Sequence, residues 1–488
     1  MHLNMTHKKA LKIYFVIATI FILLQLTIFF NIFQLTDDFT YFYIGKAITE
    51  GSYPYKEIMA VHPPLHYYMM AMIYAIFGAN FFILKFFVMI NILSISYFLF
   101  KIVSLKYNYG ISLVSVVLFL FSGTILESAY GSAGAFETLT FIIIAYYLFL
   151  KNKLFFSGIF FALGGLTRLY FFPIFLIVLF FSLIKIENSK IVMKYKNTLK
   201  IIFGFLVLFV PVNLFFILKY GSGYYLGVFT QQILSEIYGG YLRRVDYPLT
   251  WKLNAIWQMA KMNIVIFFVP FLLLLSKRIK SLAMPFLIII SYIIFILNLN
   301  EIFPHYFYLI FPFLAMISAP LLFEKQYFFA LINNHLSKIL VVSILVFFSI
   351  SIATIVQNYN LIKESTDNEK SFLAIVDEIS ANSGPNDKIF GSDAGTHFIA
   401  LKSDRRIIMD FVDQRVPDNA FRQFLELIKN RNDLKFIIFE LRGTQDAYYG
   451  FRGINNLPEY RKFIGSICGE GKGYSENNLT YALYPCNQ

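Results

Sequence analysis

The sequence has few charged residues for its length. Charged side chains make up 15% of the 488 residues, hydrophobic ones make up 58%, and the mean hydropathy is +0.63. A soluble domain of this length could not bury so much apolar surface. The composition therefore excludes a soluble protein and predicts a polytopic α-helical membrane protein.

Nucleotide-binding and metal-binding motifs are also absent. No Walker-type or dinucleotide-type Gly-rich loop occurs, which argues against soluble nucleotide-driven chemistry. The 7 histidines include no His-x-x-His pair; His62 and His66 are four residues apart, but two prolines lie between them. We predict no cofactor and no metal ligand; a divalent metal stays open, without a motif to support it.

Basic residues are in excess, but their distribution does not suit nucleic acid. Residues 1–357 carry 26 Lys and Arg against 11 Asp and Glu, whereas residues 358–488 carry 16 against 18. The basic excess thus lies between the apolar segments, as the positive-inside rule and anionic lipid headgroups require. We therefore expect membrane lipids, and no nucleic acid, as partners.

The apolar runs predict about eleven transmembrane spans and their orientation. Lysines ahead of the first run place the N-terminus in the cytoplasm, and an odd number of spans then places residues 358–488 outside the cell membrane. Residues 64–78 are interpreted as an interfacial helix, with a short span as the alternative. The runs are 12–32, 80–100, 111–126, 135–150, 154–167, 169–184, 199–218, 263–275, 282–298, 304–322 and 338–357.

Residues 358–488 have a different character, with clustered acidic residues and short apolar bursts. Bursts alternating with amphipathic segments predict a small extracytoplasmic α/β domain. The only cysteines, Cys468 and Cys486, lie there and favour one disulfide, with two buried thiols as the alternative. The bursts are Lys388–Gly391, Arg406–Phe411, Lys435–Glu440 and Thr480–Tyr484, and the helical segments are 361–381 and 417–430.

The stretch 36–68 organises the rest of the chain. Two adjacent carboxylates follow the first apolar run, where ionisable groups are costly and indicate function. The stretch resembles the first outer loop of the GT-C glycosyltransferases, which include protein O-mannosyltransferases and aminoarabinose transferases and take sugars from polyprenyl phosphates. The matching residues are Asp37-Asp38, Tyr41, Ala47, Gly51 and His62-Pro63-Pro64-Leu65, with His62 where the family most often has Lys.

The resemblance implies a catalytic domain over residues 1–357, with outer loops 33–79 and 219–262, and a soluble domain over 358–488. It implies transfer of a sugar from a polyprenyl-phosphate donor to an acceptor protein, lipid or glycan, with inversion. Asp37 would be the catalytic base, and Asp38 either a second catalytic group or a helix cap. Tyr41 would position the sugar or the acceptor.

Other candidate residues come from the later loops. Glu127 ends the third predicted span, and Glu137 begins the fourth. The resemblance implies that Glu127 positions the acceptor and that Glu137 is a second catalytic carboxylate. An ion pair with Arg168 is the structural alternative for Glu137. Arg168 ends a Gly-Gly-Leu-Thr-Arg phrase, and its alternative role is to reach lipid headgroups. The residues assigned to the donor phosphate or its lipid are His62, Arg168, Arg243, Arg244, His305 and Tyr306.

Two other functional classes remain open at this stage. A transporter or flippase of lipid-linked glycans should carry ionisable residues in broken helices at mid-membrane, but the acids here concentrate near one surface. A catalytically inactive assembly protein would share the same fold. The sequence favours the transferase.

Overall fold

The computed structural model divides into two compact units, which we describe separately. Unit 1 comprises residues 1–30, 85–214 and 247–359, and unit 2 comprises residues 31–84, 215–246 and 360–488. The structure describes residues 5–29, 37–58, 60–128, 134–187, 190–225, 227–229, 248–271, 279–299, 302, 304–323, 333–391, 394–408, 429, 431–442, 458–476 and 479–486.

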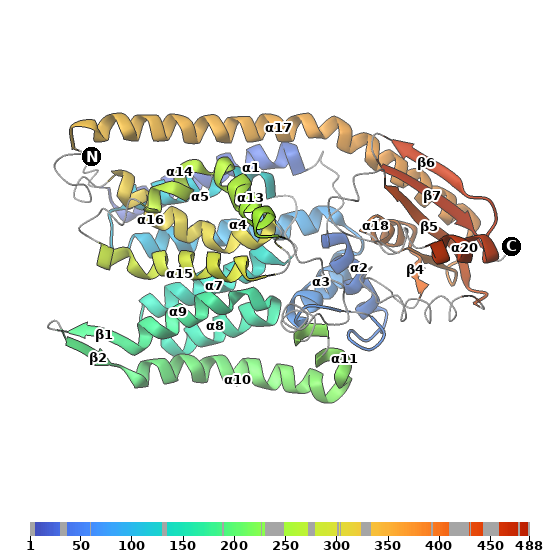
Figure 1. Ribbon diagram of the computed structural model, residues 1–488, viewed down its shortest axis with the longest axis horizontal. Helices are drawn as coiled ribbons and strands as arrows, with labels where there is room; N and C mark the ends of the chain where they lie inside the picture. Colours follow the sequence, from blue (N-terminus) through green and yellow to red (C-terminus); the bar gives the residue numbers. More distant parts are fainter. Residues whose placement is uncertain are drawn as a thin grey trace. The chain divides into compact units, whose positions relative to one another are not determined.

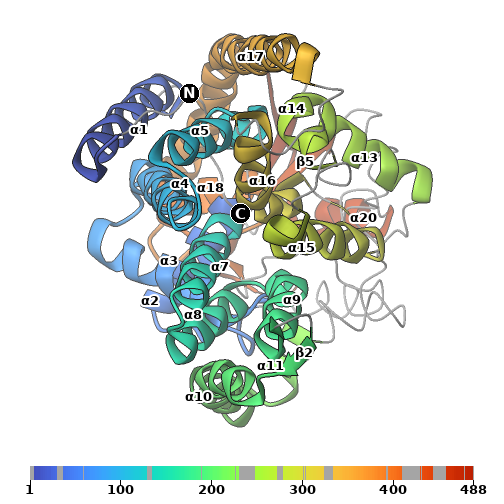
Figure 2. The ribbon, with the colours of Figure 1, turned by 90° about the vertical axis from the view of Figure 1, so that its left-hand side faces the viewer.

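Unit 1 is built from apolar helices (Figures 1 and 2). Near-continuous runs of Leu, Ile, Val and Phe are apolar enough to enter a bilayer. A helix suits them there because it satisfies each backbone N–H and C=O group within its own segment. Its elements are α1 (His7–Phe29), most of α4 (Phe81–Val103), α5 (Tyr109–Leu120), α6 (Gly123–Ser128), α7 (Ala135–Leu150), α8 (Leu154–Thr167), η1 (Leu169–Phe171), α9 (Phe172–Leu183), β1 (Ile184–Glu187), β2 (Lys190–Met193), most of α10 (Tyr195–Tyr220), α13 (Leu249–Met262), α14 (Ile264–Phe268), α15 (Ile279–Leu297), η4 (Pro304–Ile310), α16 (Phe311–Phe323) and the first part of α17 (Asn333–Asn382).

Among the described residues, five helices are long and apolar enough to cross a membrane. They become six if the bent pair Leu249–Met262 and Ile264–Phe271, which turns by 115°, forms one broken span. Shorter apolar helices of 10–17 residues accompany them, so the count of eleven spans stays a prediction. The five helices cover His7–Leu26, Phe81–Val103, Tyr195–Tyr220, His305–Leu322 and Val342–Ile362.

A sharp bend precedes the predicted span 263–275, and Asn263 lies at this bend. Asn263 separates α13 from α14, and its side-chain amide donates hydrogen bonds to Thr124 Oγ1 (2.5 Å) and to the Met259 carbonyl (2.8 Å). A buried polar side chain with these partners stabilises a sharp turn. The apolar run therefore continues as a separate helix from Ile264, after this turn.

Glycines bring α8 and α10 into close contact. A Cβ built on Gly158 would collide with the Ile201 carbonyl of α10, and one on Gly204 would collide with the Phe155 carbonyl of α8. Small residues let the backbones of two membrane helices approach closely. Such close packing holds the helices together, because lipid tails are as apolar as the side chains and no hydrophobic effect drives the helices to associate. The two glycines therefore fix where these helices cross.

Unit 2 contains a five-stranded sheet in the order β4-β3-β5-β7-β6. β3 pairs in parallel with β4 and β5, and β7 pairs antiparallel with β5 and β6. Figure 1 shows α20 and the end of α17 beside this sheet. The elements of unit 2 are α2 (Asp37–Thr49), α3 (Pro64–Phe77), α11 (Ser222–Tyr225), the end of α17, β3 (Lys388–Phe390), α18 (Ala394–Ser403), β4 (Arg406–Ile407), β5 (Leu434–Arg442), α20 (Pro458–Ile467), β6 (Lys472–Glu476) and β7 (Leu479–Pro485).

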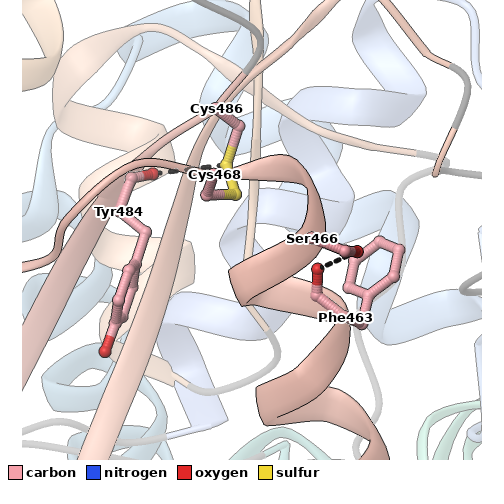
Figure 3. Close-up of a disulfide and its surroundings, with 5 residues drawn as sticks. All are labelled: Phe463, Ser466, Cys468, Tyr484 and Cys486. Carbon is pink, nitrogen blue, oxygen red and sulfur yellow. Dashed lines mark hydrogen bonds between the residues drawn. A yellow bond between two sulfur atoms is a disulfide. The ribbon is translucent and has the colours of Figure 1, made fainter.

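The sheet has its own apolar core and a disulfide. Phe390, Leu434 and Ile437 are buried beside Phe463 of α20. Cys468 and Cys486 form a disulfide that joins the end of α20 to the end of β7 (Figure 3). This pairing is the one that the sequence favoured.

The units divide the chain differently from the predicted domains in one respect. Residues 31–84 and 215–246, which include much of the two predicted outer loops, cluster with the C-terminal residues rather than with the apolar helices. The predicted helix 361–381 is also not separate, because α17 is a single helix of 50 residues. No Gly or Pro interrupts it, so nothing local ends the helix after the apolar run.

Candidate functional site

The acid pair lies in the first turn of α2. Asp37 is exposed and Asp38 is partly exposed. Negative side chains are favourable at this end of a helix, because the unpaired backbone N–H groups give it a partial positive charge. An exposed carboxylate in such a turn is accessible to an acceptor and can take a proton from it.

One side of α2 packs against the residues that precede and begin α3. Tyr41 is buried, its hydroxyl lies 3.1 Å from His62 Nε2, and its ring meets the edge of His66 at 4.9 Å between centroids. The backbone of His62 is also fixed, since its N–H donates to the Tyr67 hydroxyl (3.2 Å) and its carbonyl accepts from the Tyr55 hydroxyl (2.7 Å). The structure thus brings together Tyr41 and His62, two residues that the sequence singled out.

The other side of α2 contacts α18 and β4, which the sequence did not anticipate. Thr40 Oγ1 lies 3.1 Å from His397 Nδ1, and the backbone N–H of Ile407 donates to the Tyr43 hydroxyl (2.7 Å). Lys46, only 1% exposed, pairs with Asp404 at 2.7 Å. Lys46 offered the only sequence signal, as a charged residue in an otherwise apolar turn.

A second group of candidates meets in unit 1, where α7 begins and α8 ends. Gly134 precedes α7 with φ +77°, and a Cβ there would lie 2.8 Å from Arg168 Nε. Gly134 is therefore needed both for its left-handed backbone and for the space occupied by the guanidinium. Arg168 itself ends α8 in an extended conformation and is 4% exposed.

The 3₁₀ segment η4 completes this group. His305 lies close enough to Arg168 for the guanidinium charge to act on its imidazole. The Tyr170 hydroxyl donates to the Tyr306 hydroxyl (2.7 Å), with their ring centroids 4.4 Å apart. Tyr308 stacks on Phe136, the residue before Glu137, at 5.0 Å. We call Gly134, Arg168, Tyr170, His305 and Tyr306 the arginine cluster.

The arginine cluster unites three candidates that lie far apart in the sequence: Arg168, His305 and Tyr306. Glu137 is in the first turn of α7, three residues after Gly134, and is 1% exposed. Such burial of a carboxylate requires partners and is typical of a functional or structural site rather than a surface. Tyr170 was missed, because nothing in its apolar surroundings distinguishes it from a core residue.

The remaining candidates fall elsewhere. Glu127 lies near the end of α6 and is partly exposed. Arg243 and Arg244 lie outside the residues that the structure describes. Within the described part of the chain, no group of three His, Cys, Asp or Glu side chains could hold a metal ion.

The sequence matches no protein-family model and no curated protein. Solved structures do resemble this one. ArnT from Cupriavidus metallidurans bound to undecaprenyl phosphate matches with a TM-score of 0.67 and 10% identity over 96% of this chain and 97% of that chain. The Archaeoglobus fulgidus oligosaccharyltransferase in the apo form gives 0.56 and 13% over 89% and 70%.

The same oligosaccharyltransferase, tethered to an acceptor peptide containing the NVT sequon, matches with a TM-score of 0.50 and 13% identity over 97% of this chain and 74% of that chain. ArnT is an aminoarabinose transferase, and both enzymes are GT-C membrane glycosyltransferases. At such low identity the likeness concerns the fold. The chain has the fold of the GT-C membrane glycosyltransferases.

Proposed function

We propose that the protein transfers a sugar from a polyprenyl-phosphate donor to an acceptor protein, lipid or glycan at the outer face of the cell membrane. The bond between the anomeric carbon and the phosphate oxygen breaks, and a bond from the acceptor to that carbon forms on the opposite face. The acceptor proton passes to Asp37, and the polyprenyl phosphate leaves with the bonding electrons. No metal enters this scheme.

The donor phosphate is assigned to the arginine cluster. A phosphate is a good leaving group, so it needs a cation rather than a proton donor. Arg168 supplies that cation, and a guanidinium can bind two phosphate oxygens at once. His305 and Tyr306 add polar groups beside it, and Glu137 is a second carboxylate in this region. Arg243 and Arg244 are assigned to the same phosphate from the sequence alone.

The carboxylate chemistry is assigned to α2. Asp37 is exposed and near the positive end of the helix, which keeps its carboxylate ionised and accessible as a base. Asp38 points to a different side of the helix and is assigned a supporting role. Tyr41 lies one turn further along α2 and is hydrogen-bonded to His62. Tyr41 and Glu127 are assigned to positioning the sugar or the acceptor, and His62 is assigned to the donor phosphate.

The observation that carries this proposal is the arginine cluster, formed in a fold shared over nearly its whole length with a protein solved with undecaprenyl phosphate. A guanidinium beside a histidine and two tyrosines offers several hydrogen-bond donors and a positive charge, which suit the oxygens of a phosphate. A lipid-linked phosphate has that charge, and its apolar tail suits a helical membrane unit.

Binding of undecaprenyl phosphate to the purified protein in detergent tests this assignment. Arg168→Gln should weaken binding by about 10- to 100-fold, the usual effect of losing hydrogen bonds to a charged group. Lys151→Gln, in the exposed turn between α7 and α8, removes a positive charge from the same unit and should leave affinity unchanged. Equal affinities for the wild-type protein and Arg168→Gln would remove Arg168 from the phosphate site. Retained binding without any cleavage of sugar-phosphate donors would favour a transporter.

A further inference from the structure

Two histidines from different parts of unit 2 meet consecutive residues of α2. His397 belongs to α18 and is 1% exposed, and its Nδ1 lies 3.1 Å from Thr40 Oγ1. His62 precedes α3, and its Nε2 lies 3.1 Å from the Tyr41 hydroxyl. The two contacts therefore restrain one turn of α2 from two sides. Figure 1 labels the three helices.

The position of this turn relative to Asp37 is set by helix geometry. Successive residues are about 100° apart around the axis, so Thr40 lies about 60° to one side of Asp37 and Tyr41 about 40° to the other. Asp37 thus projects between the two restrained residues, one turn nearer the helix start. Asp38 has only Tyr41 comparably close, so the restraint favours Asp37.

The contact with α18 extends beyond the histidine. The Tyr43 ring packs against His397 at 5.5 Å between centroids, and Lys46 pairs with Asp404 immediately after α18. Residues 40, 43 and 46 recur every three positions and so follow one side of α2. The helix is therefore fixed to α18 and to the residue that follows it along nearly two turns, and His397 holds the turn nearest the carboxylates.

We infer that His397 is a positioning residue, which sets the direction of the Asp37 carboxylate through its hydrogen bond to Thr40. This inference rests on the proposed function, in which Asp37 is the base. It gives α18, within the C-terminal region, an influence on the reaction that acts through Thr40 and α2. A base must lie within hydrogen-bond reach of the proton that it takes, so a small rotation of α2 costs turnover.

Spin labelling tests the positioning without any substrate. The only two cysteines form a disulfide, so Asp37→Cys introduces a single reactive thiol. His397→Leu should increase the mobility of a label at residue 37, as should Thr40→Val, which removes the hydroxyl at nearly constant volume. His397→Asn retains a hydrogen-bonding group near the Nδ1 position and should restore the wild-type spectrum. A label at Thr49→Cys, an exposed residue ending α2, should not change.

Unchanged mobility at residue 37 in both His397→Leu and Thr40→Val would overturn the inference. Increased mobility at residues 37 and 49 alike would also overturn it, because that result means general loosening of the helix. Since the two substitutions act on opposite sides of one hydrogen bond, failure of one variant to fold leaves the other as the test.

Turnover then tests the consequence, with Asp37 intact. The probe is a panel of undecaprenyl-phosphate monosaccharides with membranes of the parent organism as acceptor. His397→Leu should lower kcat by about 10- to 100-fold while leaving affinity for undecaprenyl phosphate unchanged, and His397→Asn should recover most of it. Full turnover by His397→Leu alongside impaired Asp37→Asn would overturn the inference alone. Full turnover by Asp37→Asn would overturn the proposed base, while the label spectra would still decide the positioning.

Discussion

At the scale of single residues, Asp37 and Arg168 differ in every physical respect that matters to their proposed roles. Asp37 is exposed in the first turn of a helix, whereas Arg168 is 4% exposed at the end of one. An accessible carboxylate can exchange a proton with an incoming acceptor. A buried guanidinium suits a partner that stays bound, such as a phosphate carried by a lipid.

Replacing Asp37 by Asn tests the base directly. The substitution keeps the size and most hydrogen bonds but removes the ability to accept a proton. We expect turnover to fall by roughly 10²–10⁴-fold, the usual range for lost general base catalysis. Undecaprenyl phosphate binding and expression should hardly change, because an exposed carboxylate contributes little to folding. Undiminished transfer by Asp37→Asn would shift the assignment to Asp38.

Asp433 predicts how unit 2 responds to acid. It accepts two hydrogen bonds from Arg431 (2.7 and 2.8 Å) and pairs with Lys388 at 3.1 Å, so the Arg431 hydrogen bonds first, and then Lys388, hold the pKa of its carboxyl well below the ordinary value of 3.8. A lowered pKa contributes stability above pH 3.8 that is lost as the pH falls below it.

Asp433→Asn should therefore lower the free energy of unfolding of unit 2 at pH 7 by about 0.2–1 kcal/mol, since the pair is partly screened by water. The difference from wild type should shrink steadily as the pH falls below 3.8, toward the lowered pKa of this carboxyl. Circular dichroism melting at a series of pH values measures this. Asp377→Asn, at an exposed aspartate of α17, makes the same charge change and should show no such dependence. A difference that stays constant as the pH falls from 5 to 2 would contradict the assignment.

At the scale of elements, the sequence predicted those segments that have a strong apolar period or run. The run 80–100 became α4 (Phe81–Val103), and the bursts at Lys388 and Lys435 became β3 and β5. Residues 64–78 became α3 (Pro64–Phe77), which at about 1.5 Å per residue is too short to cross a bilayer without help.

The segments that it missed lack such a signal. β6 (Lys472–Glu476) reads Lys-Gly-Tyr-Ser-Glu and is a polar edge strand that pairs only with β7. The antiparallel pair of β1 and β2 lies almost entirely between the apolar runs 169–184 and 199–218, where no apolar pattern predicts a strand. The contacts of Thr40 with His397 and of Lys46 with Asp404 join residues more than 350 positions apart, which no local pattern can reveal.

Gly45 tests how closely α2 and α3 must pack. A Cβ at Gly45 would lie 2.7 Å from the Met70 carbonyl carbon and 2.8 Å from the Ala71 backbone nitrogen, and backbone cannot move aside cheaply. Gly45→Ala should lower stability by about 1–3 kcal/mol, as overpacking usually does. Gly465→Ala in α20 meets open space and should instead stabilise by about 0.5–1 kcal/mol. Thermal melting compares them, and a stabilised Gly45→Ala would refute the close contact.

At the scale of the whole molecule, the chain has the fold of ArnT, which was solved with undecaprenyl phosphate, although the two sequences are only 10% identical. Such divergence is expected where most positions need only be apolar and of suitable size. For the proposed transfer, what must persist is the chemistry at the membrane surface. Under that proposal, the side of the membrane on which α2 and the sheet lie decides which donor pool the protein can use.

Cysteine accessibility in right-side-out membrane vesicles tests that side. The native cysteines are joined in a disulfide, so an impermeant maleimide reports on single introduced thiols. Lys429→Cys, exposed in unit 2, should react in intact vesicles because parity and the positive-inside rule place the C-terminal region outside. Lys151→Cys, exposed in the turn between α7 and α8, should react only after permeabilisation. Reaction of both thiols on one side would refute the topology. Protection of Lys429→Cys alone would place unit 2, and with it the acid pair, on the inner side of the membrane, where a donor at the outer face cannot reach it.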